Sequence, residues 1–160
     1  MHFALALAFL ALLAAPAVAQ DDDKPDAKAA AAIHRCIKSH GARHANWENC
    51  IGMVAEPCLK HEAARSTADN MACIAREQKV WNVILNETYR GLRGKLDEQQ
   101  QVKLRDMQRA WIASRDRTCA FYWDYFQGTM ASPMSASCEN RETGRRALFL
   151  LGFLNDAEGK

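Results

Sequence analysis

Apolar residues recur every three or four positions along most of the chain, which is the spacing of α-helices with one buried face. The pattern predicts three long helices over residues 71–95, 98–125 and 133–154, and two shorter helical pieces over 29–40 and 46–64. No stretch shows the alternation of apolar and polar residues that is typical of a strand. We therefore predict an all-α fold, a helical bundle.

The first two long helices are separated only by a short turn at Asp97-Glu98, so they should be antiparallel neighbours. Ser66–Asn70 supplies cap-forming residues before the first of them. Its apolar stripe is formed by Ile74, Trp81, Leu85, Tyr89, Leu92 and Leu96. The stripe of the last helix is formed by Thr143, Ala147, Leu150 and Leu154, with Gly144 inside the helix as a site of close packing.

The stripe of the second long helix is partly polar. Its members follow one another at spacings of four, three, four and four: Leu104, Gln108, Trp111, Arg115 and Cys119. A face that holds an amide and a guanidinium beside an indole either buries a polar pair or presents a binding surface. We favour a buried structural network, with Asn86 and Tyr89 on the first long helix and Glu142 on the last helix as candidate partners of Gln108 and Arg115.

The clearest loop of the chain lies between the second and third long helices. Its candidate binding residues are Gln127, Gly128, Thr129, Met130, Ser132 and Pro133, of which Ser132 and Pro133 read as the N-cap and first position of the last helix. A run of aromatic residues leads into it: Phe121, Tyr122, Trp123, Tyr125 and Phe126. The loop is either a plain connector or a contact surface flanked by large aromatic side chains.

Six cysteines favour a disulfide framework, because an even number is typical of exported chains. A bond between Cys119 and Cys138 would clamp the helices on either side of the loop. For the other four cysteines we expect Cys36 with Cys50 and Cys58 with Cys73, although six cysteines permit 15 connectivities.

The N-terminus reads as a secretory signal peptide over residues 1–19, because an apolar run precedes the small-residue pattern Ala17-Val18-Ala19. We expect a disordered linker over 20–28, then a Cys- and His-containing helical segment over 29–70 that packs with a helical domain over 71–156 as one domain. The protein should be periplasmic or secreted. No cysteine that could carry a lipid anchor lies directly after the apolar run, and no other stretch is apolar enough to span a bilayer. We therefore expect no stable membrane insertion.

The net charge of +2 is spread over interspersed charges of both signs, which disfavours nucleic acid as a partner. Four histidines lie near three cysteines in the segment 29–70, namely His34, His40, His44 and His61. A metal site there is a minor alternative, because Gly41 interrupts the helix, the chain has no Cys-x-x-Cys pair, and oxidation favours bonding the thiols to one another. The sequence also contains none of the common catalytic motifs, so we expect neither a cofactor nor an enzymatic activity.

The long helices carry four ordered motifs that resemble the LprI family of small exported helical proteins. They are Leu85-Asn86-x-x-Tyr89-x-x-Leu92, Leu104-Arg105-x-x-Gln108-Arg109-Ala110-Trp111-Ile112, Arg115-Asp116-x-x-Cys119, and Cys138 with Thr143-x-x-Arg146. The resemblance covers residues 73–154 and departs from the usual pattern at Asn82, where Asp is usual.

The resemblance implies lysozyme inhibition, with the loop Gln127–Pro133 as a plug for the cleft of a lysozyme or another peptidoglycan hydrolase. Two carboxylic groups line such a cleft. A net charge of +2 offers no attraction to a basic lysozyme. The alternative function is a structural or adaptor protein of the cell envelope that binds an endogenous partner.

Overall fold

The computed structural model describes residues 24–41, 46–61 and 66–159, and every element within these ranges is helical. The elements in order are α1 (Ala27–Ser39), the 3-10 helix η1 (Trp47–Cys50), α2 (Ala55–Lys60), α3 (Thr67–Arg93), α4 (Glu98–Tyr125), the 3-10 helix η2 (Gly128–Met130) and α5 (Ala131–Glu158). The predicted all-α fold is confirmed. No helix in the described part of the chain combines the length and apolarity needed to cross a membrane. The predicted signal peptide, residues 1–19, lies outside the described residues.

Side-chain caps set the start of the helices. Capping boxes begin the two helices α3 and α4, formed by Ser66 with Asp69 and by Asp97 with Gln100 respectively. Helix α4 has the predicted bounds. Asp26 caps α1 by accepting a hydrogen bond from the Ala29 backbone N–H at 2.9 Å, which lowers the pKa of the Asp26 carboxyl.

Several predicted boundaries are wrong. Helix α3 begins at Thr67 and ends at Arg93, against a predicted 71–95, and α5 continues to Glu158, beyond the predicted end at 154. Because Asp26 begins α1, residues 27 and 28 are helical and do not belong to a linker. The segment predicted as one helical piece over 46–64 forms η1 and α2, separated by a turn, with Pro57 in the first turn of α2. Helix α5 starts at Ala131, directly after η2, so Ser132 and Pro133 lie inside its first turn, where proline lacks only an N–H that has no helical partner.

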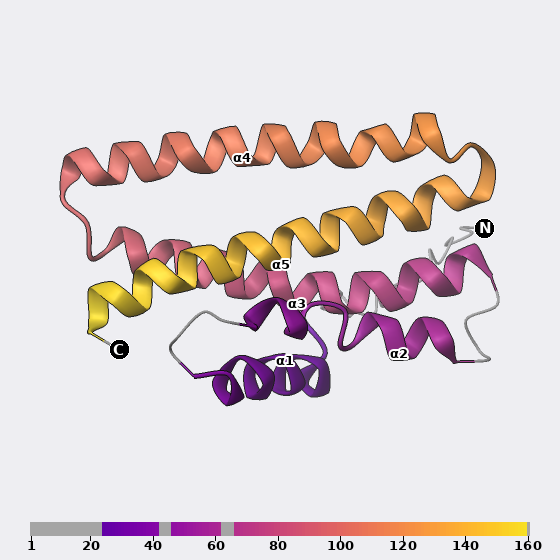
Figure 1. The fold of residues 1–160 in the computed structure, drawn as a ribbon, viewed down its shortest axis with the longest axis horizontal. Coiled ribbons are helices and arrows are strands. Elements are labelled where there is room, and N and C mark those ends of the chain that lie inside the picture. Colours follow the sequence, from indigo (N-terminus) through magenta and orange to yellow (C-terminus); the bar gives the residue numbers. More distant parts are fainter. Residues whose placement is uncertain (1–23, 42–45, 62–65, 160) are drawn as a thin grey trace, which may run out of the picture.

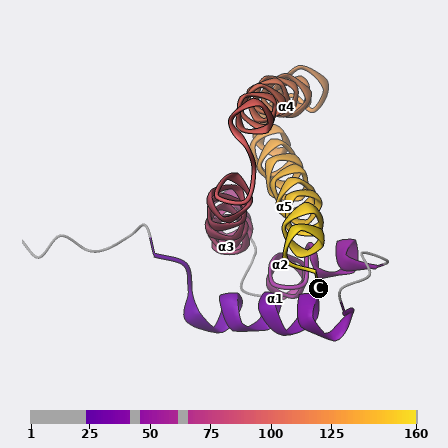
Figure 2. The ribbon, with the colours of Figure 1, turned by 90° about the vertical axis from the view of Figure 1, so that its left-hand side faces the viewer.

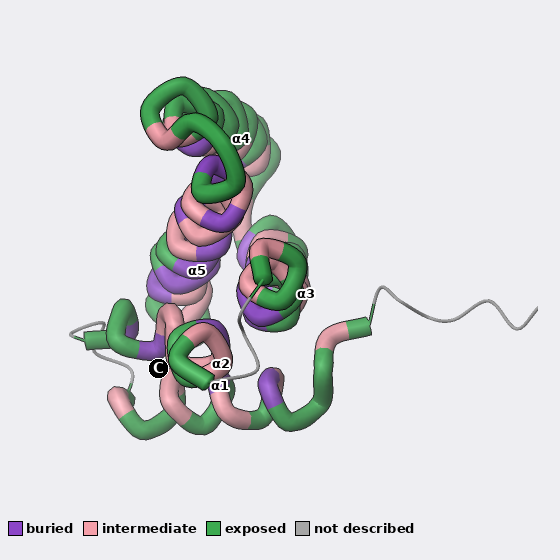
Figure 3. Tube along the Cα trace, turned by 90° about the vertical axis from the view of Figure 1, so that its right-hand side faces the viewer, coloured by how far each residue is buried: buried purple, intermediate pink, exposed green. Residues whose placement is uncertain are grey.

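Helix α5 is the centre of the structure. It packs along α3 on one side and along α4 on the other, whereas α3 and α4 barely touch (Figure 1; Figure 2). Helices α3 and α4 run in opposite directions, as predicted (Figure 1), but the prediction that they pack as neighbours is wrong. The burial pattern agrees, because α5 has more buried residues than any other described helix, whereas the buried residues of α4 are Leu104 and Cys119 (Figure 3).

The main core lies between α3, α5 and the N-terminal segment α1–α2. Trp81 of α3, Leu150 of α5 and Ile33 of α1 are each fully enclosed in it. Gly144 allows this close packing, because a Cβ atom at that position would lie 3.0 Å from a side-chain carbon of Ile51 and 3.2 Å from the Trp81 indole. Leu96 and Tyr89, expected in the α3 stripe, pack against the rim of the core and are partly buried.

A buried carboxylate joins the N-terminal segment to the long helices. Glu77 of α3 is completely inaccessible to solvent. Its two oxygens accept five hydrogen bonds, from the backbone N–H groups of Gly52 (2.6 Å), Val54 (2.9 Å) and Ala55 (2.8 Å), from Trp81 Nε1 (2.9 Å) and from Asn140 Nδ2 (3.1 Å). The donors come from the turn before α2, from α3 and from α5, so one side chain fixes the relative position of three segments.

Replacing Glu77 with Gln should lower the free energy of unfolding by about 2–4 kcal/mol, because the new amide would place an N–H group against buried N–H donors. Denaturant unfolding with the disulfides intact measures the change. Glu87→Gln, at an exposed position of the same helix, is the matched control and should shift stability by less than about 0.5 kcal/mol. Equal effects of the two substitutions would contradict the structural role assigned to Glu77.

Candidate functional site

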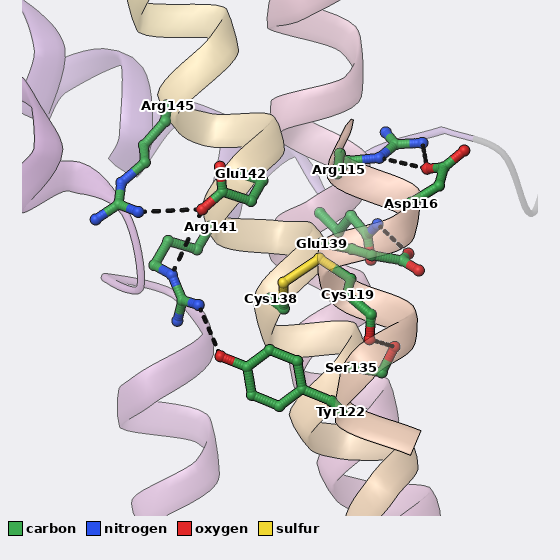
Figure 4. Close-up of a disulfide and its surroundings, with 11 residues drawn as sticks. Arg115, Asp116, Cys119, Tyr122, Ser135, Cys138, Glu139, Arg141, Glu142 and Arg145 are labelled. Carbon is green, nitrogen blue, oxygen red and sulfur yellow. Dashed lines mark hydrogen bonds and ion pairs between the residues drawn. A yellow bond between two sulfur atoms is a disulfide. The ribbon is translucent and has the colours of Figure 1, made fainter. Parts of the chain in front are cut away.

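The turn between α4 and α5 is held together covalently. Cys119 near the end of α4 and Cys138 in α5 form a disulfide, with their Cα atoms 5.5 Å apart, and both residues are buried (Figure 4). Ser135 Oγ donates a hydrogen bond of 3.0 Å to the Cys119 carbonyl oxygen. The end of this helical hairpin is therefore fixed where the chain reverses direction.

Beyond the disulfide, large apolar side chains point into solvent. We define the aromatic tip as Phe121, Trp123, Tyr125 and Met130, whose exposed fractions are 61%, 54%, 70% and 55%. Phe121 and Tyr125 share one face of α4, with ring centroids 6.1 Å apart, whereas Trp123 leaves the helix on the opposite side. Exposed large apolar side chains are typical of interaction sites.

Neighbouring rings support the tip from behind. Tyr122 and Phe126 stack with their centroids 5.7 Å apart, and Tyr125 meets Phe126 edge-on at 5.0 Å. The Tyr122 hydroxyl accepts a hydrogen bond of 3.4 Å from Arg141 Nη2 of α5 (Figure 4). Tyr125 therefore packs against a partly buried ring, which lowers the conformational entropy that this side chain would lose on binding.

The predicted binding loop divides into two parts. Gln127, Gly128, Thr129 and Met130 are exposed, whereas Ser132 is half-buried and Pro133 is buried in the start of α5. Gly128 has a φ of +74°, a left-handed conformation that favours glycine and turns the chain sharply. Any contact of the loop with a partner therefore rests on 127–130 and not on Ser132 or Pro133.

The tip is electrostatically different from the chain as a whole. From Ala120 to Ser135 the one side chain that is charged at pH 7 is that of Asp124. The last turn of α4 contains no basic residue, so the partial negative charge of its terminal carbonyl groups is not offset within that turn. The segment 120–135 therefore carries one negative charge, and Arg141 of α5 places a positive charge beside it at the Tyr122 hydroxyl.

A second cluster of polar and aromatic side chains joins the middle of α4 to α5. Two guanidinium groups lie over the Trp111 ring, that of Arg115 at 5.0 Å and that of Arg146 at 5.6 Å from its centroid. Gln108 Oε1 accepts a hydrogen bond of 2.8 Å from Arg146 Nε. The family-like motif positions Gln108, Trp111, Arg115 and Arg146 are therefore brought together by the α4–α5 contact.

The polar network expected from the sequence has different members. Arg115 pairs with its neighbour Asp116 at 2.7 Å and not with Glu142, which pairs with Arg145 of its own helix at 3.1 Å (Figure 4). The two α3 residues, Asn86 and Tyr89, form no hydrogen bond with Gln108 or Arg115 in the described part of the chain: Asn86 is exposed, and Tyr89 is partly buried against the core. The reason is that α5 separates α3 from α4.

The N-terminal cysteines are also bonded in pairs. The structure joins Cys36 to Cys50 and Cys58 to Cys73, the pairs expected from the sequence. His40 lies within metal-ligand distance of the first pair, but these two sulfurs are bonded to each other, so neither offers a thiolate. His34 and His61 are exposed, and His44 lies outside the described residues. This arrangement disfavours the metal-binding alternative.

Sequence reasoning missed two central polar residues, Glu77 and Arg146. Glu77 lies between Ile74 and Trp81 at spacings of three and four, so a charged residue inside an apolar stripe was the available signal. Arg146 stands in a family-like motif, but Arg115 shares the Trp111 face of its own helix and was assigned the buried role instead.

These features define a small all-α protein, stapled by three disulfides, that presents an aromatic tip at the end of a helical hairpin. The family model described as lysozyme inhibitor LprI matches residues 58–150. This is more than half of the chain, and the protein belongs to the LprI family. The match includes α3, α4 and most of α5. Neither the curated proteins nor the solved structures contain a match to the chain.

Replacing Arg115 with Ala should lower the free energy of unfolding by no more than about 1 kcal/mol, because its acid partner is exposed and its ring contact is only partly buried. Thermal or denaturant unfolding measures this, with Arg117→Ala at an exposed position of α4 as control. A loss above about 3 kcal/mol would place Arg115 in a buried network after all.

Replacing Cys119 and Cys138 together with Ser should lower the free energy of unfolding by about 3 kcal/mol, because the bond closes a loop between positions 19 residues apart. Hydrogen exchange should accelerate most at the end of α4 and the start of α5. Uniform acceleration over all helices would show that the bond does not act locally on the tip.

Proposed function

We propose that the protein is exported and acts as a non-catalytic inhibitor of a lysozyme or a related peptidoglycan hydrolase, with the hairpin end as the part that enters the enzyme cleft. Membership of the lysozyme inhibitor LprI family supports the class of function. The main observation in favour of this site is the aromatic tip, which combines exposed apolar area with a nearby disulfide that fixes the helical hairpin. The apolar N-terminal run and the three disulfides support export to an oxidising compartment.

The chemistry of the tip suits a cleft lined by carboxylic groups. The exposed side chains of Gln127 and Thr129 provide hydrogen-bond donors for cleft oxygens, next to rings that provide contact area. The rings are carried by a helix and a closed turn, so little flexibility is lost on binding.

The charges near the tip bear more directly on attraction to a basic lysozyme than the net charge of the chain does. The net charge of +2 would not attract a basic lysozyme, but the end of α4 carries Asp124 and the helix carbonyl groups, with Arg141 of α5 as the cation that meets it. Steering depends on the charges near the contact more than on the total charge, since salt screens charges beyond about 10 Å.

The test is inhibition of a panel of lysozymes of different types by the oxidised protein lacking residues 1–19. We expect inhibition of at least one enzyme at micromolar protein. Trp123→Ser together with Tyr125→Ser should weaken that inhibition at least about tenfold, as expected for removal of aromatic anchors. Ile112→Ser, which removes an apolar side chain of 40% exposure from the middle of α4, is the matched control and should retain full inhibition.

One result would contradict the function and another would contradict the proposed contact site. Lack of inhibition across the panel would favour the alternative of an envelope structural or adaptor protein. Inhibition that survives the tip substitutions but is lost in the Ile112 variant would move the contact from the tip to the side of α4.

A further inference from the structure

Arg146 is a buried cation without an acidic partner. Only 8% of the residue is exposed, and burial lowers the pKa of its guanidinium. Within the described residues Arg146 forms no ion pair with a carboxylate, whereas Arg115 and Arg145 pair with Asp116 and Glu142. Buried charges are normally paired, so this exception points to a ligand.

Of two parallel N–H donors of Arg146, one has a hydrogen-bond partner in the described structure and the other has none. The group has a fork of two parallel N–H donors, Nε and Nη2, which matches the two oxygens of a carboxylate. Gln108 Oε1 takes the Nε donor at 2.8 Å, whereas Nη2 is buried and has no hydrogen-bond partner. One amide oxygen therefore lies at a pair of donors that could bind both oxygens of a carboxylate.

Aromatic rings restrict how a ligand can approach. The Arg146 guanidinium lies over Trp111 at 5.6 Å and over Phe149 at 5.2 Å from the ring centroids. Ring contacts use the faces of the guanidinium, so hydrogen bonds must form in its plane. Gln108, which accepts the Nε hydrogen bond, is only partly buried, so its side chain is in contact with solvent.

We propose that Arg146 is a carboxylate-binding site and that Gln108 occupies it in the absence of ligand. The arriving carboxylate displaces the Gln108 amide into solvent and accepts hydrogen bonds from both Nε and Nη2. The site lies about two helical turns along α5 from Cys138, so it is separate from the aromatic tip and does not depend on the proposed inhibition.

Gln108→Glu tests the geometry without any ligand, because it places a carboxylate on the fork from within the chain. The variant should raise the thermal midpoint by about 2–5 °C, since a charge-assisted pair replaces a neutral hydrogen bond. Ser114→Glu adds the same charge at an exposed position of α4 and should leave the midpoint unchanged within about 1 °C. A midpoint of Gln108→Glu at or below that of the parent would overturn the proposal.

The ligand test follows the Arg146 Nε–H signal by NMR during titration with sodium acetate, against sodium chloride at equal ionic strength. Acetate should shift the signal saturably. Gln108→Ala, which removes the occupant, should bind acetate at least threefold more tightly, and Gln108→Glu should not respond. A response to acetate no larger than that to chloride would overturn the proposal, even if Gln108→Glu is stabilised.

A second titration identifies the source of the carboxylate. An N-acetylglutamyl peptide that competes with acetate would extend the site to acidic side chains of polypeptides. Competition by acetate alone would limit the site to small carboxylates. Both results require the Arg146 fork, so the acetate response must disappear in the Gln108→Glu variant in either case.

Discussion

The structure depends most on the hydrogen bonds to the Glu77 carboxylate. A buried charge is strongly unfavourable unless its oxygens are hydrogen-bonded, and here five donors surround it. Three of those donors are backbone N–H groups of the turn before α2 and of its first residue, Ala55, which have no partner within a helix. The same carboxylate holds Trp81 and Asn140, so the short N-terminal elements, α3 and α5 are placed by one group.

This arrangement determines which helices α4 can pack against. The N-terminal segment and α5 cover α3, so α4 packs mainly along α5 and keeps most of its surface in solvent (Figure 3). A helix with one neighbour buries little apolar area, and stronger local contacts must hold it. The Cys119–Cys138 bond does so at one end, and Trp111 with its two guanidinium groups does so in the middle.

Periodicity and capping chemistry are local properties, so the sequence predicted the all-α fold and the bounds of α4 correctly. They do not specify which helix covers which apolar face. The short turn at Asp97 predicted that α3 and α4 would be neighbours, but the many buried positions of α5 place it between them. The error in the polar network has the same origin: both Arg115 and Arg146 reach Trp111, and only the position of α5 decides which of them is buried.

The two buried charged groups, Glu77 and Arg146, differ in how completely the chain satisfies their hydrogen bonds. This difference distinguishes a structural role from a binding role. Every oxygen of Glu77 is used, its donors belong to the chain, and removing it would leave several groups unpaired. Arg146 has one neutral acceptor and an unpartnered buried nitrogen, so the fold leaves part of its hydrogen-bonding capacity unused. The chain satisfies the buried charge of Glu77 completely. A single Gln108→Glu substitution would give Arg146 an internal acidic partner in the same way. That Gln108 is neutral therefore makes Arg146 available to an external carboxylate, which an internal one would exclude.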